Sequence, residues 1–159
     1  MPTAFPYRHV LQTSGGVTNM NVDGSVTPVN FDFAPVTTGE IFYMSQLMFI
    51  LGSGGVVNQL LTKFADLAAL ANGIDLSFTF GGVTLTRSSY VKTNMDLYRI
   101  FNIKTSVNEV GTTTMMTGDI KQDPPIIFLP NDRMRITIRD NLTSLTAMSM
   151  ILYGKMYKG

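Results

Sequence analysis

Apolar and polar residues alternate along much of this chain, a pattern that predicts β-strands with one buried side and one solvent-facing side. The alternation is clear at residues 74–80 and 83–86, where a Gly-Gly turn joins the two segments into a predicted hairpin. It is clearest at residues 133–139, which we expect to form the last hairpin of the chain with residues 145–153. These segments predict antiparallel strands.

Other segments extend this pattern. Residues 5–10, 17–22 and 26–33 predict short strands, and residues 41–51 are apolar at nearly every position. An unbroken apolar run is typical of a strand covered on both sides, so we expect residues 41–51 to form the central strand. An Asp-Pro-Pro sequence at residues 123–125 should block regular pairing just before the next apolar segment.

One helix is predicted, at about residues 59–71, because its apolar residues repeat at helical spacing. Asn58 is a candidate N-cap and Gly73 a candidate left-handed residue after the C-cap. Residues 94–103 fit neither the helical nor the strand period, and we interpret them as a strand with irregular ends. The apolar stripe of the helix predicted at about residues 59–71 consists of Leu60, Leu61, Phe64, Leu67, Ala68 and Ala71.

The number and spacing of these segments predict a fold class. About eight to ten short strands with one inserted helix are typical of a mostly β, jelly-roll-like antiparallel β-sandwich. We expect residues 17–159 to form this single domain and residues 1–16 to form an N-terminal arm. Phe5 and Tyr7 flank Pro6 in this arm, and we expect them to bind a neighbouring subunit.

Composition changes the picture by indicating self-association. Charged residues make up 14% of the 159 residues, against roughly 25% in average globular chains, and the formal net charge is +1. A net charge near zero promotes association, so we expect a homodimer or homotrimer. Cysteine is absent, and no signal peptide or apolar stretch of membrane-spanning length is visible. The sequence therefore predicts a protein made in a reducing cytoplasm, without disulfides or membrane contact.

Residues suited to catalysis are few. His9 is the single histidine, and Glu40 and Glu109 are the only glutamates. The glycine-rich segments lack the residues of phosphate-binding and dinucleotide-binding loops. We therefore expect no catalytic residue, no metal site and no cofactor, and the sequence predicts a protein that is not an enzyme.

Arg133, Arg135 and Arg139 form the one patterned polar surface that the sequence predicts. Their guanidinium groups could bind carboxylates of an acidic neighbouring protein, or they could form ion pairs on a solvated strand surface. The second interpretation is favoured over the first. Nucleic acid is not an expected partner, because the overall charge is nearly neutral and no aromatic nucleic-acid motif accompanies the arginines.

Three stretches carry a resemblance to a known class of proteins. They are residues 20–29 (MNVDGSVTPV) followed by GEIFY at 39–43, residues 64–76 (FADLAALANGIDL), and residues 129–142 (LPNDRMRITIRDNL). With these stretches, the chain resembles small structural virion proteins of tailed bacteriophages, of the capsid decoration or cement type. The resemblance covers residues from about 10 to the end.

The resemblance implies a jelly-roll-like subunit that binds junctions between major capsid proteins and stabilises the particle. It also implies a place on the capsid surface of the virion after assembly in the bacterial cytoplasm. Two alternatives remain open: a head-fibre base or tail component, and a carbohydrate-binding β-sandwich that serves host adhesion. The second would use exposed tyrosines such as Tyr43, Tyr90 or Tyr98 to stack against sugars.

Overall fold

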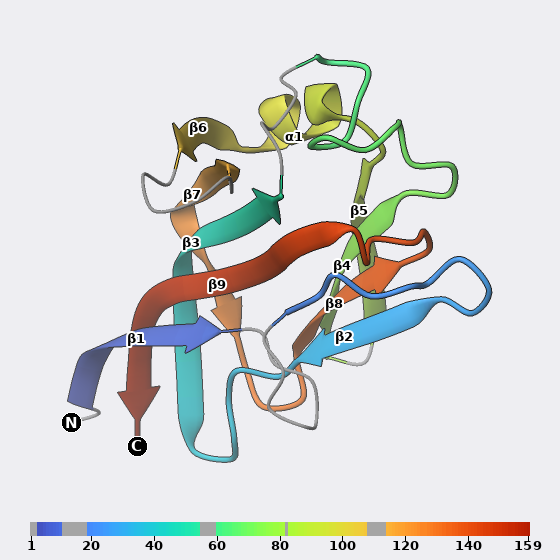
Figure 1. The fold of residues 1–159 in the computed structure, drawn as a ribbon. Coiled ribbons are helices and arrows are strands. Elements are labelled where there is room, and N and C mark those ends of the chain that lie inside the picture. Colours follow the sequence, from blue (N-terminus) through green and yellow to red (C-terminus); the bar gives the residue numbers. More distant parts are fainter. Residues whose placement is uncertain (1–2, 11–18, 55–59, 82, 108–113) are drawn as a thin grey trace.

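The protein is a β-sandwich in the computed structural model, which describes residues 3–10, 19–54, 60–81, 83–107 and 114–159 (Figure 1). Within these residues, nine strands form two antiparallel sheets, and there is one short helix. The predicted mostly β class and two-sheet architecture are therefore confirmed. The jelly-roll connectivity stays a prediction.

The larger sheet has five strands in the order β1-β9-β3-β7-β6, and the smaller has four in the order β2-β8-β4-β5. The predicted central strand is indeed in the middle of the larger sheet, and the predicted hairpin at residues 74–86 is β4 and β5. The strands are β1 (Thr3–Val10), β2 (Val29–Phe33), β3 (Glu40–Ser53), β4 (Ile74–Phe80), β5 (Val83–Val91), β6 (Asn102–Val107), β7 (Thr114–Phe128), β8 (Arg133–Ile138) and β9 (Leu145–Lys158).

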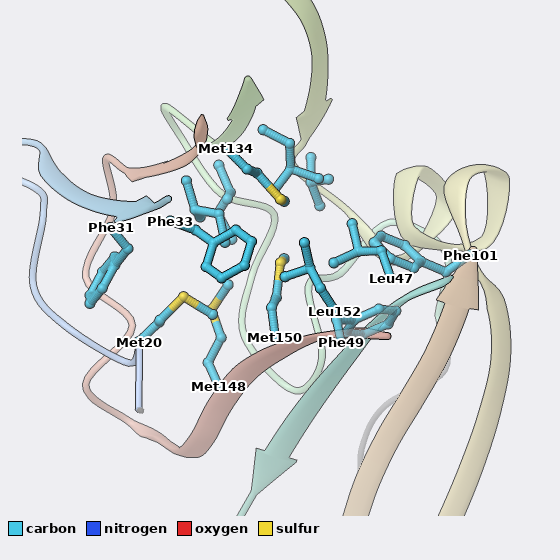
Figure 2. Packing of buried hydrophobic residues seen from close by; sticks show 14 of the residues in the cluster. Met20, Phe31, Phe33, Leu47, Phe49, Phe101, Met134, Met148, Met150 and Leu152 are labelled. Carbon is cyan, nitrogen blue, oxygen red and sulfur yellow. The ribbon is translucent and has the colours of Figure 1, made fainter. Parts of the chain in front are cut away.

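The two sheets bury their apolar sides against each other. Phe33 of the smaller sheet meets Phe128 of the larger sheet edge to face, with ring centroids 6.3 Å apart. Methionines fill the space around these rings, as their flexible side chains allow. Figure 2 shows the packing of Met20, Phe31, Phe33, Leu47, Phe49, Phe101, Met134, Met148, Met150 and Leu152.

The last predicted hairpin is wrong. β8 pairs with β2 and β4, whereas β9 pairs with β1 and β3, so the chain crosses from one sheet to the other between them. Both strands alternate apolar and polar residues, and both turn their apolar side into the core. Alternation therefore cannot distinguish two strands that face each other across the core from two strands that pair side by side in one sheet.

The predicted helix is also wrong, because residues 60–71 form turns. Ala65 has a left-handed φ of 52°, which interrupts a right-handed helix. The side-chain amide of the buried Asn94 accepts a hydrogen bond from the Ala65 backbone N–H at 2.7 Å. It also donates one to the Leu60 carbonyl at 3.0 Å. The Asp140 carboxylate accepts bonds from the amides of residues 71–73. Distant side chains thus bind the backbone groups that a helix would pair internally.

The one helix, α1 (Asn94–Ile100), lies where a strand with irregular ends was predicted. It begins after Thr93. The Asp96 carboxylate in its first turn accepts hydrogen bonds from the amides of Lys92 and Thr93, at 2.9 and 3.0 Å. Thr93 and Asp96 have the spacing of a capping box, and this signal could have located the helix. The predicted N-cap Asn58 lies outside the described residues.

The N-terminal segment belongs to the larger sheet. β1 pairs along its whole length with β9 of the same chain, from Thr3 opposite Lys158 to Val10 opposite Ile151. The part of the expected arm that the structure describes is therefore an edge strand (Figure 1). Of the strand predicted at residues 17–22, only residues 19–22 are described, and these form no strand.

Candidate interaction surface

A bulge in β3 determines which side chains the larger sheet turns outward. Pairing with both neighbouring strands skips Ser45, so the alternation along β3 changes phase there. As a result, both halves of the strand direct an apolar row into the core. This row consists of Phe42, Met44, Leu47, Phe49 and Leu51, each at most 2% exposed.

The opposite side of β3 is only half-buried, which corrects the prediction that this strand is covered on both sides. Ile41, Tyr43, Met48 and Ile50 lie on it. Because an apolar run hides the phase of the alternation, the bulge could not be predicted, and the polar Ser-Gln pair within the run was its one signal.

Glycine allows the neighbouring strand to follow this bulge. A Cβ atom at Gly154 of β9 would overlap the Tyr43 carbonyl oxygen, so only glycine fits there. On the other side of β3, pairing with β7 stops at Lys121 and resumes at Ile126. This confirms the predicted interruption at residues 123–125.

Three tyrosines and two cations gather on the outer side of the larger sheet, near the bulge. We name them the tyrosine–cation face: Arg8, Tyr43, Tyr153, Lys155 and Tyr157. Arg8 is directly opposite Tyr153, and Lys155 is directly opposite Tyr43. The Tyr43 and Tyr157 rings are in contact, with centroids 4.9 Å apart. The alternating side chains of three strands thus form one continuous surface.

A shallow depression of about 410 Å³ lies in this surface at the bulge. Arg8 and Lys155 are exposed beside it, and the Ser45 hydroxyl donates a hydrogen bond to the Tyr153 carbonyl at 3.4 Å. Neither cation forms an ion pair with a described residue. We name it the bulge depression; it is lined by Pro6, Tyr7, Arg8, Ser45, Tyr153, Gly154 and Lys155.

Phe5 and Tyr7, which are predicted to bind a partner, are half-buried and pack against the core, and partner binding by them stays a prediction. The Tyr7 ring meets Phe42 edge to face at 5.5 Å. Burial, reinforced by the charge of Glu40, raises the pKa of the Tyr7 hydroxyl above its usual value. The Lys158 ammonium lies 5.9 Å from the centre of the Phe5 ring. These aromatic residues anchor β1, which exposes Pro6 and Arg8 on its other side.

The predicted arginine stripe lies on the outer side of the smaller sheet, where two of its members form ion pairs. Arg135 binds Asp32 through two hydrogen bonds, of 2.6 and 2.8 Å, and Arg139 binds Asp75 at 3.0 Å. The bond from Arg135 lowers the pKa of the Asp32 carboxyl below its usual value. This supports the interpretation of the stripe as a solvated surface with local ion pairs. Arg133 is exposed and pairs with no described carboxylate.

The tyrosines considered for sugar binding belong to three different elements, and Tyr43 and Tyr90 lie on different sheets. Tyr43 belongs to the larger sheet, whereas Tyr90 is on β5 of the smaller sheet and Tyr98 is on α1. Tyr90 and Tyr98 are 42% and 39% exposed. The companions of Tyr43 are instead Tyr153 and Tyr157, which sequence reasoning did not single out because neighbouring strands are unknown until the register is known.

Among the described residues, no group of three His, Cys, Asp or Glu side chains could hold a metal ion. The His9 side chain and Glu109 lie outside them. No helix in the described part of the chain has the length and apolar character needed to cross a membrane. The absence of catalytic, metal and cofactor sites stays a prediction.

Comparison with protein-family models finds no match to this chain, and comparison with curated proteins finds none either.

Proposed function

We propose that this protein is a structural virion subunit that decorates and stabilises a bacteriophage capsid by binding junctions between major capsid proteins. One observation supports a role in contact with other proteins: the larger sheet turns an aromatic and cationic surface outward. Tyrosine and arginine are enriched at the energetically important positions of protein interfaces. Combined with the sequence resemblance, the tyrosine–cation face is the surface that would contact the capsid.

The physical basis of such a role is repetition. A single sandwich offers a modest contact area, but on a symmetric lattice the same contact is repeated by many copies. A dimer or trimer binds more tightly still, because it is held at several points at once. The low charge of the chain is compatible with close packing of copies. In this proposal the subunit has jelly-roll connectivity, assembles in the bacterial cytoplasm and lies on the capsid surface.

Co-sedimentation with phage particles that lack this protein tests the proposal. The purified protein should sediment with the particles at hundreds of copies each, and light scattering should show a discrete dimer or trimer before binding. A handful of copies per particle would assign it to a head-fibre base or tail component. A protein that stays in the supernatant at every concentration would contradict a virion role.

Carbohydrate binding is the second candidate, favoured by the grouping of Tyr43, Tyr153 and Tyr157 on one surface. Partly exposed tyrosine rings on one surface can stack against sugar rings. A glycan array probed with the protein and with the Tyr153→Ala variant tests this candidate. Binding to a defined glycan that the variant loses would favour it, and an array without signal would exclude the sugars tested.

A further inference from the structure

The outer side of the larger sheet is unusually cationic for a chain whose formal net charge is +1. Four cations and one carboxylate face outward at its paired described positions, and the exposed Asp123 lies in the unpaired part of β7, so the net charge of this surface is +2. None of the four cations forms an ion pair with a described residue. They are Arg8, Lys104, Lys121 and Lys155, and the carboxylate is Asp119, which accepts a hydrogen bond from Gln46.

This charge distribution argues against a second copy of the chain on the same surface. In a two-fold interface centred on the bulge depression, Arg8 and Lys155 would lie close to the same two cations of the second copy. Like charges that are brought together and dehydrated at an interface repel each other and disfavour the complex. A negatively charged partner avoids this cost and gains from it.

The register defines the spacing of the two cations beside the bulge depression. Because Pro6 is opposite Lys155 and Arg8 is opposite Tyr153, Arg8 and Lys155 are diagonal neighbours. Diagonal neighbours on an antiparallel pair are about 7–8 Å apart. In an extended chain, side chains two residues apart point the same way at a distance of about 6.8 Å. Two alternate carboxylates of an extended segment therefore match the two cations.

We infer that the bulge depression binds an extended acidic segment of a partner protein, in which two acidic residues are separated by one other residue. Arg8 holds one carboxylate in a two-pronged hydrogen bond, and Lys155 holds the next. The backbone between the two carboxylates lies over the Tyr153 ring, which is a neighbour of both cations. This inference rests on the proposed function, because it gives the chemistry of the capsid segment that the face would contact.

Synthetic peptides test the spacing directly. The probe is a blocked nonapeptide with glutamate and threonine in alternation, titrated into the intact protein at low salt and followed by NMR chemical shifts. Two reference peptides have glutamine in place of glutamate, or the same glutamates in one uninterrupted run. The alternating peptide should bind at least about tenfold more tightly than either. Equal binding of the uninterrupted peptide would overturn the inferred spacing.

Matched variants locate the site. The double variant Arg8→Gln and Lys155→Gln should lose at least about tenfold in affinity for the alternating peptide. The double variant Lys104→Gln and Lys121→Gln removes the same charge from the same outer surface at positions outside the depression, and it should lose much less. Equal losses in the two variants would show general attraction to a cationic surface and would overturn the inference. A heparin tetrasaccharide that bound more tightly than the peptide would overturn it as well.

Particle binding separates this inference from the proposed function. If the alternating peptide binds as expected and the protein ignores the particles, the acidic site stands and the virion role fails. If the Arg8→Gln and Lys155→Gln variant sediments with particles as well as the unaltered protein does, the virion role stands and the acidic site fails as its basis.

Discussion

The outer surfaces of the two sheets differ in how they satisfy their charged groups. On the smaller sheet, Arg135 and Arg139 bind carboxylates of neighbouring strands. On the larger sheet, Arg8 and Lys155 stand among tyrosines without a described ion pair. A surface whose charges are paired internally needs no partner, whereas unpaired cations beside half-buried rings are suited to bind one. The two surfaces therefore differ in whether the strand register places carboxylates beside their cations, and not in the number of arginines.

The largest expected effect comes from a steric clash beside the bulge that shapes the tyrosine–cation face. In Gly154→Ala the new methyl group overlaps the Tyr43 carbonyl, so β3 and β9 must separate. We expect a loss of about 3 kcal/mol in the free energy of unfolding, measured by urea denaturation. Gly54→Ala is the control, because its methyl group would lie 3.7 Å from the nearest atom, the Thr146 Cγ2. Equal midpoints for the two variants would refute this reading of the bulge.

Truncating a ring on each surface sharpens the comparison. Tyr157→Ala on the larger sheet should weaken attachment to particles by about 2 kcal/mol, as expected for an aromatic anchor. Tyr90→Ala on the smaller sheet is the matched control and should leave attachment unchanged. Both variants should keep a free energy of unfolding within about 1 kcal/mol of the original protein, since each loses one partly exposed ring. Co-sedimentation measures the attachment, and a larger loss with Tyr90→Ala would reverse the assignment of the two surfaces.

Breaking an ion pair on the smaller sheet should have a smaller effect. Asp32→Ala and Arg135→Ala, singly and together, form a double-mutant cycle whose coupling energy we expect to be about 0.5–1 kcal/mol. The two side chains are 42% and 41% exposed, so water and salt screen their attraction. The three variants should attach to particles normally. A loss of attachment would show that the outer surface of the smaller sheet contacts the particle, although its charges are paired.

The smallest effect is a pH dependence at the rim of the larger sheet. Glu40 bonds to the Lys158 ammonium at 2.7 Å and to the Thr37 amide and hydroxyl, and these bonds lower the pKa of its carboxyl from 4.5 to about 2. A folded-state pKa below the unfolded value means that the stabilisation is complete above about pH 4.5 and disappears as the pH falls towards 2.

Glu40→Gln should remove that part of the acid sensitivity. Thermal unfolding between pH 2 and 6 measures it, with Asp123→Asn as a control for the loss of an exposed carboxylate. If the original protein and Glu40→Gln lose stability equally over this range, Glu40 does not contribute to acid unfolding.

The strands could be predicted from the sequence to a greater extent than their neighbours. Alternation located β4, β5, β8 and β9, because a half-buried strand reports its own periodicity. It could not show that β8 and β9 belong to different sheets, since pairing depends on contacts across the whole chain. The ion pair between Asp32 and Arg135 joins residues 103 positions apart and was invisible for the same reason.

The helix was misplaced because hydrogen bonds from side chains distant in sequence outweigh the local helical pattern. Residues 60–71 have helical apolar spacing, but Asn94 and Asp140 bind their backbone in turns. The candidate site was missed for a similar reason. Phe5 and Tyr7 were chosen as apolar residues of an expected arm, but pairing with β9 turns them inward and leaves Arg8 outside. Only the register brings Arg8 beside Tyr153 and Lys155.

The position of β9 between β1 and β3 also determines when the larger sheet can form in a growing polypeptide. β1 is the first of the described strands to be made, yet its neighbour in the sheet is the last described strand to leave the ribosome. Until β9 emerges, the apolar β3 has an open edge, and such edges promote aggregation of nascent chains. Contacts between residues so distant in sequence also slow folding. A ribosome-bound chain that ends before β9 should therefore be sensitive to proteases and should depend on chaperones for its solubility.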